Sequence, residues 1–333
     1  MLPTHSAILF EAAVLRACEL LKQGEVVALP TETVYGLAAN ALDPKGVSRI
    51  YEIKGRPAHN PIIVHVSSFA LARSCVNEWP AVAEKLGRAF WPGPLTMVLR
   101  RAACIPDIVT AGGETVGIRW PSHPFIQSVI GRCGFPLAAP SANPANRVSP
   151  TNAEHVRKYF GDRLKLIVDG GQSHVGIEST VVDLSVCPPR LLRPGMIHEQ
   201  ALLSVTDELV SPADNHGILK SPGQLRQHYS PRAGLLIRSW RNEEDLRRQI
   251  RMNQLQAPPE KTRIIAHTNI PPGEGFAGVA VIPHDPEAFA RALYAALHEC
   301  DDAGAELIVV EDLPETAEWQ GIRDRLKRAA SGE

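Results

Sequence analysis

The chain has 333 residues, of which 44% are apolar and 21% are charged. This composition supports a buried core and excludes a disordered or collagen-like chain. The length exceeds what one ordinary hydrophobic core fills, so two domains are expected. The net charge of −1 excludes the strong positive field of a dedicated nucleic-acid binder, and any anionic ligand must be held by local groups.

Apolar periodicity in the first two hundred residues predicts alternating helices and strands. Helices are expected at 7–23, near 44–54, within 69–90, at 123–132 and at 151–160. Strands are expected at 25–29, 62–66, 96–100, 116–120, 135–139, 164–168, 180–184 and 190–193. Several neighbouring strands have no helix between them, so the sequence predicts an α/β domain with a twisted sheet of mixed parallel and antiparallel strands.

From about 203 to 232 the periodicity fades, and Ser, Pro, Asp, Asn and Gly accumulate. That change is typical of an inter-domain linker. Beyond it, strands at 234–238, 262–266, 278–282 and 305–310 alternate with helices at 242–252, 286–300 and 315–330, which predicts a small parallel, Rossmann-like α/β domain. We therefore expect a first domain over 1–203, a linker over 204–232 and a second domain over 233–333.

The six cysteines are scattered, with no CxxC pair and no Cys/His cluster at zinc-finger spacing. They favour reduced thiols. The chain begins without a signal-peptide pattern, and no stretch reaches the roughly 18 apolar residues of a membrane span. A cytoplasmic protein with no membrane association is therefore expected.

Two segments that follow predicted elements carry polar and charged groups. The segment 30–36, Pro-Thr-Glu-Thr-Val-Tyr-Gly, could bind a polar ligand through its hydroxyls or could cap a helix. Lys54 and Arg56 flank a glycine ahead of two prolines. In an extended or turning segment both cations could converge on one polyphosphate, whereas a solvated surface loop is the alternative.

Arg119 lies in an apolar strand, so its guanidinium should be buried and needs a carboxylate. Glu32, Asp169, Glu178 or a substrate could provide it.

Small residues end another strand just before Ser141 and Asn143, which would allow a ligand to approach the backbone closely. Ser149 and Thr151 could bind a ligand or cap the helix that follows. The sequence contains no GxSxG, HExxH or paired-cysteine motif. This pattern favours an enzyme that holds two anionic substrates together over a serine hydrolase or a zinc enzyme.

Taken in order, these segments resemble the YrdC-like family. The matching motifs are PTETVYGL (30–37), KGRP..NP (54–61), FWPGPLT (90–96), VGIRWP.HP (116–124), APSAN (139–143), SPT (149–151), GIEST (176–180) and LRPG (192–195). The linker and second domain resemble the two-domain form of threonylcarbamoyl-AMP synthases. The resemblance implies a nucleotidyltransferase that converts L-threonine, bicarbonate and ATP into threonylcarbamoyl-AMP and pyrophosphate, the first step of threonylcarbamoyl-adenosine formation in tRNA.

By motif position, the resemblance also implies residue roles. Catalytic roles beside the phosphates and the carbamate fall to Lys54, Arg56 and Tyr35. Threonine would be held by Thr33, His65, Arg119, Ala139 and Ser179. ATP would be held by Arg56, Asn60, Thr115, Ser141, Asn143, Ser149, Arg193 and Tyr229. Mg²⁺ is expected on the triphosphate, and no protein ligand is assigned to it.

The same resemblance makes the linker a lid that shields the product from water, with Tyr229 closing over the nucleotide. Leu225 and Gln227 depart from the family's usual linker pattern. The implied partner is a downstream threonylcarbamoyl-transferase acting on tRNA, and no stable nucleic-acid complex is expected. Two alternatives remain: a relative with the same fold that uses another carbamoyl acceptor or lacks synthase activity, and an RNA-binding module without catalysis, which the near-neutral charge disfavours.

Overall fold

The computed structural model describes residues 1–55, 60–210, 229–252 and 257–330. The chain forms two compact units. The first comprises Met1–Ala145 and Ser149–Gln224, and the second comprises Asn146–Val148 and Leu225–Glu333. Most of the predicted linker lies outside the described residues, so its bounds stay predictions. Within the described ranges, no helix has both the length and the apolar character needed to cross a membrane.

An eight-stranded sheet organises the first unit. Its strands, from edge to edge, are β10 (Arg190–Arg193), β9 (Thr180–Asp183), β5 (Leu95–Arg100), β6 (Thr115–Arg119), β4 (Val64–His65), β7 (Leu137–Ala138), β3 (Gly36–Asn40) and β2 (Val27–Leu29). The pairs β5–β9 and β4–β6 are parallel and the others are antiparallel. The predicted mixed sheet is confirmed. A separate parallel pair joins β1 (Leu2–Pro3) to β8 (Val168–Asp169).

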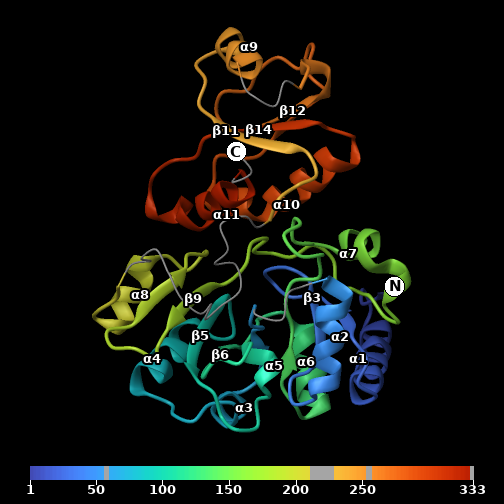
Figure 1. The fold of residues 1–333 in the computed structure, drawn as a ribbon, viewed down its shortest axis with the longest axis vertical. Coiled ribbons are helices and arrows are strands. Elements are labelled where there is room, and N and C mark those ends of the chain that lie inside the picture. Colours follow the sequence, from blue (N-terminus) through green and yellow to red (C-terminus); the bar gives the residue numbers. More distant parts are fainter. Residues whose placement is uncertain (56–59, 211–228, 253–256, 331–333) are drawn as a thin grey trace. The chain divides into compact units, whose positions relative to one another are not determined.

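Helices cover both faces of this sheet. Val27 and Leu29 pack into the cluster formed by α1 (Ala7–Lys22) and α6 (Pro124–Cys133), whereas Ala28 faces the opposite cluster. That alternation is the period of two of a strand buried on both sides. The opposite cluster contains α2 (Pro44–Lys54), α4 (Ala81–Phe90) and α7 (Ala153–Phe160). Figure 1 shows β5 beside β6, with α4 and α8 (Glu199–Thr206) lying together toward one end of the sheet.

Shorter elements complete the first unit: α3 (Phe69–Ser74), α5 (Asp107–Thr110) and η1 (Gly161–Arg163). The sequence did not predict β3, α5 or α8. β3 reads Gly-Leu-Ala-Ala-Asn, which lacks the β-branched and aromatic residues that mark strands. α5 spans four residues, too few for a visible helical period. α8 overlaps the predicted start of the linker.

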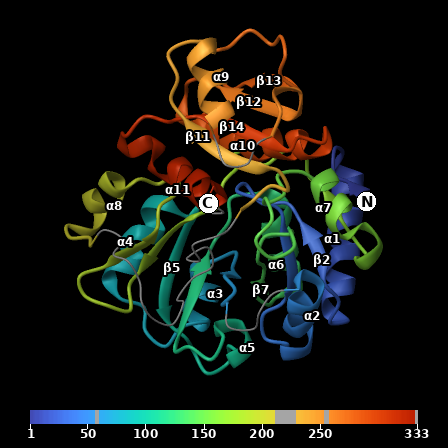
Figure 2. The same ribbon diagram turned by 45° about the horizontal axis from the view of Figure 1, so that its top comes forward.

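The second unit is built on a parallel sheet with the strand order β11 (Gly234–Arg238), β14 (Leu307–Glu311), β12 (Thr262–Ala266), β13 (Gly278–Val281). Figure 2 shows α9 (Glu243–Met252) on one side of this sheet, and α10 (Pro286–Asp302) and α11 (Gln320–Ala330) on the other. Short turns of 3₁₀ helix lie at Pro259–Lys261 and Ala317–Trp319. The predicted parallel α/β domain is confirmed.

Candidate active site

Helix α2 carries Lys54 to the site. Asp43 caps its amino end by accepting hydrogen bonds from the N–H groups of Lys45 and Gly46. Gly55, in the left-handed region at φ 59°, ends it. Lys54 is therefore the last residue of a helix, and the prediction of an extended segment at this position is wrong. Arg56 lies outside the described residues.

The Lys54 ammonium group is only 4% exposed and donates to the backbone carbonyls of Ser141 and Asn143. The loop from Ser141 to Asn143 is also held from the other side, because Ala142 donates to the Tyr35 carbonyl at 2.7 Å and Gly36 forms an isolated antiparallel bridge with Ser141. The structure thus joins three motifs that are far apart in sequence. Lys54 is the group that binds helix to loop.

The segment Thr31–Tyr35 forms a hydrogen-bonded turn. The Thr31 hydroxyl accepts from the N–H groups of Thr33 and Val34, donates to the Val34 carbonyl at 2.7 Å, and lies 2.9 Å from the Thr33 hydroxyl. A strand, β3, follows this turn, so the helix-cap alternative is wrong. The hydroxyl pattern orders the loop instead.

Tyr35 is completely buried beneath this turn. Its hydroxyl donates to the Gly171 carbonyl at 2.7 Å and accepts from the Gly170 N–H at 3.1 Å. Burial raises the pKa of Tyr35 well above its ordinary value. Tyr35 therefore keeps its proton and fixes the loop at 170–171, and a direct catalytic role for it stays a prediction.

A buried ion pair lies at the carboxyl end of β6. Arg119 Nη2 is 2.7 Å from Glu32 Oε1, and both side chains are at most 5% exposed. The prediction that Arg119 is buried against a carboxylate is confirmed. Of the protein carboxylates considered, Glu32 is the partner, because Glu178 accepts from the Ser149 hydroxyl at 2.6 Å and Asp169 accepts from the Gly171 N–H.

This ion pair leaves polar atoms unused. Among the residues that the structure describes, Glu32 Oε2, Arg119 Nε and His65 Nδ1 are buried without a hydrogen-bond partner. His65 and Arg119 are partners in the register of β4 and β6. An unpaired buried polar atom costs about 1–3 kcal/mol, so a polar ligand at these atoms would recover free energy that folding alone does not.

His65 is held neutral in this environment. Burial and, to a lesser extent, the charge of Arg119 lower its pKa from 6.5 to about 3. Unfolded His65 takes up a proton near its ordinary pKa, but folded His65 does so only near the lowered one. The folded state should therefore lose stability as the pH falls from about 6.5 toward about 3.

We expect the free energy of unfolding of the unmodified chain to fall more between near pH 7 and near pH 5 than that of a His65→Asn variant. Denaturant titrations at the two pH values measure this difference. His5→Asn, at an exposed position, should behave as the unmodified chain does. Equal pH dependence in the His65→Asn variant would contradict the assignment.

A second buried network surrounds Ser179. Arg193, 2% exposed, donates from Nε to the Ser179 carbonyl at 3.1 Å and from Nη2 to its hydroxyl at 3.2 Å. The Ser179 hydroxyl is also 2.8 Å from that of Thr96, which lies opposite Arg119 in the β5–β6 register. The sequence missed Thr96, because its motif was interpreted as a rigid aromatic turn. The available signal was a hydroxyl within the apolar strand Leu-Thr-Met-Val-Leu.

Gly195, which closes the LRPG motif, supports this network by its lack of a side chain. A Cβ atom there would lie 2.6 Å from the Thr180 backbone nitrogen and 3.0 Å from the Ser179 carbonyl carbon. Backbone cannot yield as a flexible side chain can. Gly195→Ala should therefore lower the free energy of unfolding by about 1–3 kcal/mol.

The matched control for that substitution is Gly131→Ala in α6, where an added Cβ meets nothing within 4 Å. It should be neutral or stabilising by about 0.5–1 kcal/mol. Chemical denaturation of both variants tests the pair. Equal stabilities would show that the close approach at Gly195 relaxes without cost.

The remaining predicted residues divide between the ends of the strands. Thr115 opens β6 opposite Arg100, about 13 Å of strand away from Arg119. Asn60 precedes β4, which is parallel to β6, so Asn60 and Thr115 share the amino ends of these strands. Asn60 is buried, and its Oδ1 has no hydrogen-bond partner within the described part of the chain.

Ala139 donates its N–H to the Ile63 carbonyl and is buried at the end of β7. The helix α7 is capped by Asn152, so the prediction that Ser149 or Thr151 caps it is wrong. Tyr229 belongs to the second unit, where its ring stacks on that of Tyr294 at 6.0 Å. Its predicted contact with ATP stays a prediction.

A mixed α/β sheet that brings buried cations, hydroxyls and a half-satisfied ion pair to one set of loops defines the first unit as a YrdC-like enzyme domain. A family model described as "Telomere recombination" matches residues 19–195, and one described as "Threonylcarbamoyl-AMP synthase, C-terminal domain" matches residues 196–331. The chain belongs to the threonylcarbamoyl-AMP synthase family, and it is an enzyme of the AMP-transferring class.

Curated relatives extend over nearly the whole chain. A threonylcarbamoyl-AMP synthase of Pyrococcus abyssi is 37% identical, covering 94% of this chain and 93% of its own length. One of Bacillus subtilis is 38% identical, with 95% and 92% covered. The crystal structure of P. abyssi Sua5 complexed with L-threonine superposes with a TM-score of 0.87 at 35% identity, covering 95% of this chain and 94% of that one.

Proposed function

We propose that this chain makes threonylcarbamoyl-AMP from L-threonine, bicarbonate and ATP and releases pyrophosphate. The observation that carries the proposal is the buried set of Glu32, Arg119 and His65, whose unused polar atoms match the groups of an amino acid. Arg119 Nε would donate to the threonine carboxylate, and Glu32 Oε2 would accept from the amine or the hydroxyl. Neutral His65 can hydrogen-bond without adding charge. The co-crystallised threonine of the P. abyssi relative supports this proposal.

The reaction then needs two balanced steps. The neutral threonine amine attacks bicarbonate, and water leaves as the carbamate forms. A carbamate oxygen attacks the α-phosphorus of ATP, the bond to the bridging oxygen of the β-phosphate breaks, and pyrophosphate carries away that electron pair. Both steps bring anions together, so holding the substrates and neutralising charge are the main tasks of the protein.

The proposed nucleotide contacts lie on the loops around Lys54. Lys54 holds the carbonyls of Ser141 and Asn143, and this orders the loop that would contact ATP. Ser149, through Glu178, and Arg193, through Ser179, are buried and hydrogen-bonded. Arg56 is proposed as the polyphosphate contact on its motif position alone. Its role is tested by Arg56→Ala, which should raise the KM for ATP.

A protein-held Mg²⁺ site does not fit the side chains present. Within the described ranges, no group of three or more His, Cys, Asp or Glu side chains is arranged to hold a metal ion. The carboxylates nearest the site, Glu32 and Glu178, are engaged by Arg119 and Ser149. We therefore propose that Mg²⁺ enters with the triphosphate and is held by phosphate oxygens and water.

We further propose that the enzyme works in the cytoplasm and passes its product to a threonylcarbamoyl-transferase acting on tRNA, without a stable nucleic-acid complex of its own. All six cysteines are free thiols, as a reducing compartment favours. The net charge of −1 gives no general attraction to RNA.

Pyrophosphate release by the purified chain tests the proposed reaction. With ATP, bicarbonate and threonine together we expect pyrophosphate and threonylcarbamoyl-AMP, and with any one omitted we expect neither. Release that ignores threonine but requires another amine or carbamoyl acceptor would indicate a relative with a different substrate. An absence of release together with tight, salt-dependent RNA binding would indicate the RNA-binding alternative.

A further inference from the structure

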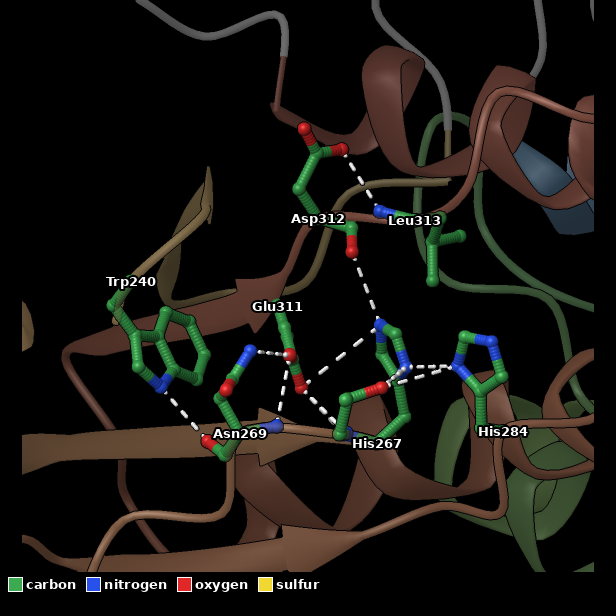
Figure 3. Close-up of polar contacts among 8 residues, drawn as sticks. Trp240, His267, Asn269, His284, Glu311, Asp312 and Leu313 are labelled. Carbon is green, nitrogen blue, oxygen red and sulfur yellow. Dashed lines mark hydrogen bonds and ion pairs between the residues drawn. The ribbon is translucent and has the colours of Figure 1, made fainter. Parts of the chain in front are cut away.

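Two histidines meet at the carboxyl edge of the parallel sheet in the second unit. His267 directly follows β12, and His284 lies three residues after β13. Their Nδ1 atoms are 2.6 Å apart and their rings stack with centroids 4.8 Å apart. Figure 3 shows the two rings with these nitrogens facing each other. The carboxyl edge is where open α/β sheets bind their ligands, and the proposed synthase reaction uses none of these residues.

The orientation of His267 is fixed by its other nitrogen. His267 Nε2 is 3.0 Å from the backbone carbonyl of Asp312, on the far side of the ring from His284 (Figure 3). A carbonyl only accepts, so Nε2 carries the proton and the Nδ1 lone pair of the neutral ring points at His284. The His267 side chain is only 4% exposed. The ring is therefore held with a basic nitrogen aimed outward.

Glu311 makes the loop that carries His267 rigid. Its carboxylate accepts from the N–H groups of His267, Thr268 and Asn269 at 2.7–2.9 Å. Burial opposes ionisation of Glu311, but these three donors outweigh it and hold its pKa below its ordinary value. One buried carboxylate thus fixes three consecutive residues after the strand.

A third donor atom joins the two nitrogens. The Thr268 hydroxyl lies 2.9 Å from His267 Nδ1 and 3.2 Å from His284 Nδ1. Trp319 packs near both imidazoles, at 5.9 Å from the His267 ring and 5.3 Å from the His284 ring. His284 itself is exposed, so the cluster has one apolar wall and one side open to water.

We propose that His267 and His284 bind a divalent transition-metal ion, of the class that prefers imidazole, through their Nδ1 atoms. Thr268 and water complete its coordination. Imidazole suits Zn²⁺, Cu²⁺ and Ni²⁺, whereas Mg²⁺ and Ca²⁺ prefer oxygen. A metal-binding histidine usually donates its second N–H to a carbonyl or carboxylate, as His267 does to Asp312.

Binding requires only small changes in the cluster. His284 moves its Nδ1 proton to Nε2 through solvent, so both rings stay neutral. Around a tetrahedral ion with metal–nitrogen bonds of about 2.0–2.1 Å, the two nitrogens separate to about 3.3 Å. The exposed His284, on the connection between β13 and α10, can make this movement while His267 stays fixed.

Titration of the full chain with Zn²⁺, followed by calorimetry, tests the site. We expect one equivalent to bind, with His284→Ala weakening that binding by more than about tenfold, since loss of even an outer-shell partner costs about 10–100-fold. His5→Ala is the control, because it removes an exposed histidine of the first unit. Binding unchanged in both His284→Ala and His267→Gln would overturn the proposal, as would no binding by the unmodified chain.

Cu²⁺ quenching of tryptophan fluorescence provides a second measurement that locates the ion. Quenching should saturate at one equivalent in the unmodified chain and should fall in His284→Ala. Trp319→Phe should remove most of the quenching while leaving Zn²⁺ calorimetry unchanged, because Trp319 is the indole beside the pair. Full quenching in Trp319→Phe would place the metal elsewhere and overturn the assignment.

Discussion

Replacement of Arg119 by methionine is expected to lower the free energy of unfolding by about 3–5 kcal/mol and to abolish threonine-dependent pyrophosphate release. The substitution leaves Glu32 buried without its ion-pair partner at 2.7 Å, which is the most costly change that one side chain can make here. It also removes the proposed donor to the threonine carboxylate. Chemical denaturation measures the first effect, and the pyrophosphate assay measures the second.

The double variant Glu32→Leu/Arg119→Met separates stability from function. Replacing both partners of a buried ion pair by apolar residues of similar size is often neutral or stabilising, so the double variant should regain most of the lost free energy. Activity should remain absent, because the polar atoms offered to threonine are gone. A stable double variant that retained threonine-dependent turnover would show that the pair serves folding alone.

Much of the fold was predictable, because the strands and long helices carry clear periods. The strands β11 and β12 occur at the predicted residues, and α2 ends at the predicted Lys54. β3 was not predicted, since its small residues have no strand signature, yet it is the strand that bridges to Ser141. Local propensity is weakest where close packing of backbone matters most.

For the site, burial and the type of partner were predictable, but the identity of the partner was not. An arginine in an apolar strand must be paired, and so Arg119 was expected against a carboxylate. Three carboxylates satisfied that requirement equally well in sequence. The choice of Glu32 depends on how the turn at 31–34 folds, and that depends on hydrogen bonds of Thr31 that no sequence pattern specifies.

The histidine pair of the second unit shows the same limit of sequence patterns. His267 and His284 are separated by 17 residues and match no metal-binding spacing. Only the parallel pairing of β12 with β13 brings them together, because it places the residues after both strands at one edge. Long-range register, unlike helical or strand periodicity, leaves no trace in a local window.

Lys54→Met is expected to lower kcat by roughly 10²–10³-fold and the free energy of unfolding by about 2–3 kcal/mol. The stability loss follows because the carbonyls of Ser141 and Asn143 lose a charged donor and the loop they belong to loses its tie to α2. The loss of rate follows because a buried cation beside the proposed nucleotide loop is a preorganised charge that water replaces poorly.

Lys45→Met is the matched control, since it makes the same substitution in the first turn of the same helix, where Lys45 is exposed. It should leave both kcat and stability nearly unchanged, because an exposed cation at a helix amino end contributes little and opposes the helix dipole. Steady-state rates and denaturation of the two variants give the comparison. If Lys54→Met lost stability but less than tenfold in kcat, Lys54 would position the loop without acting on the phosphates, and the charge acting there would have to come from another residue, with Arg56 the first to test.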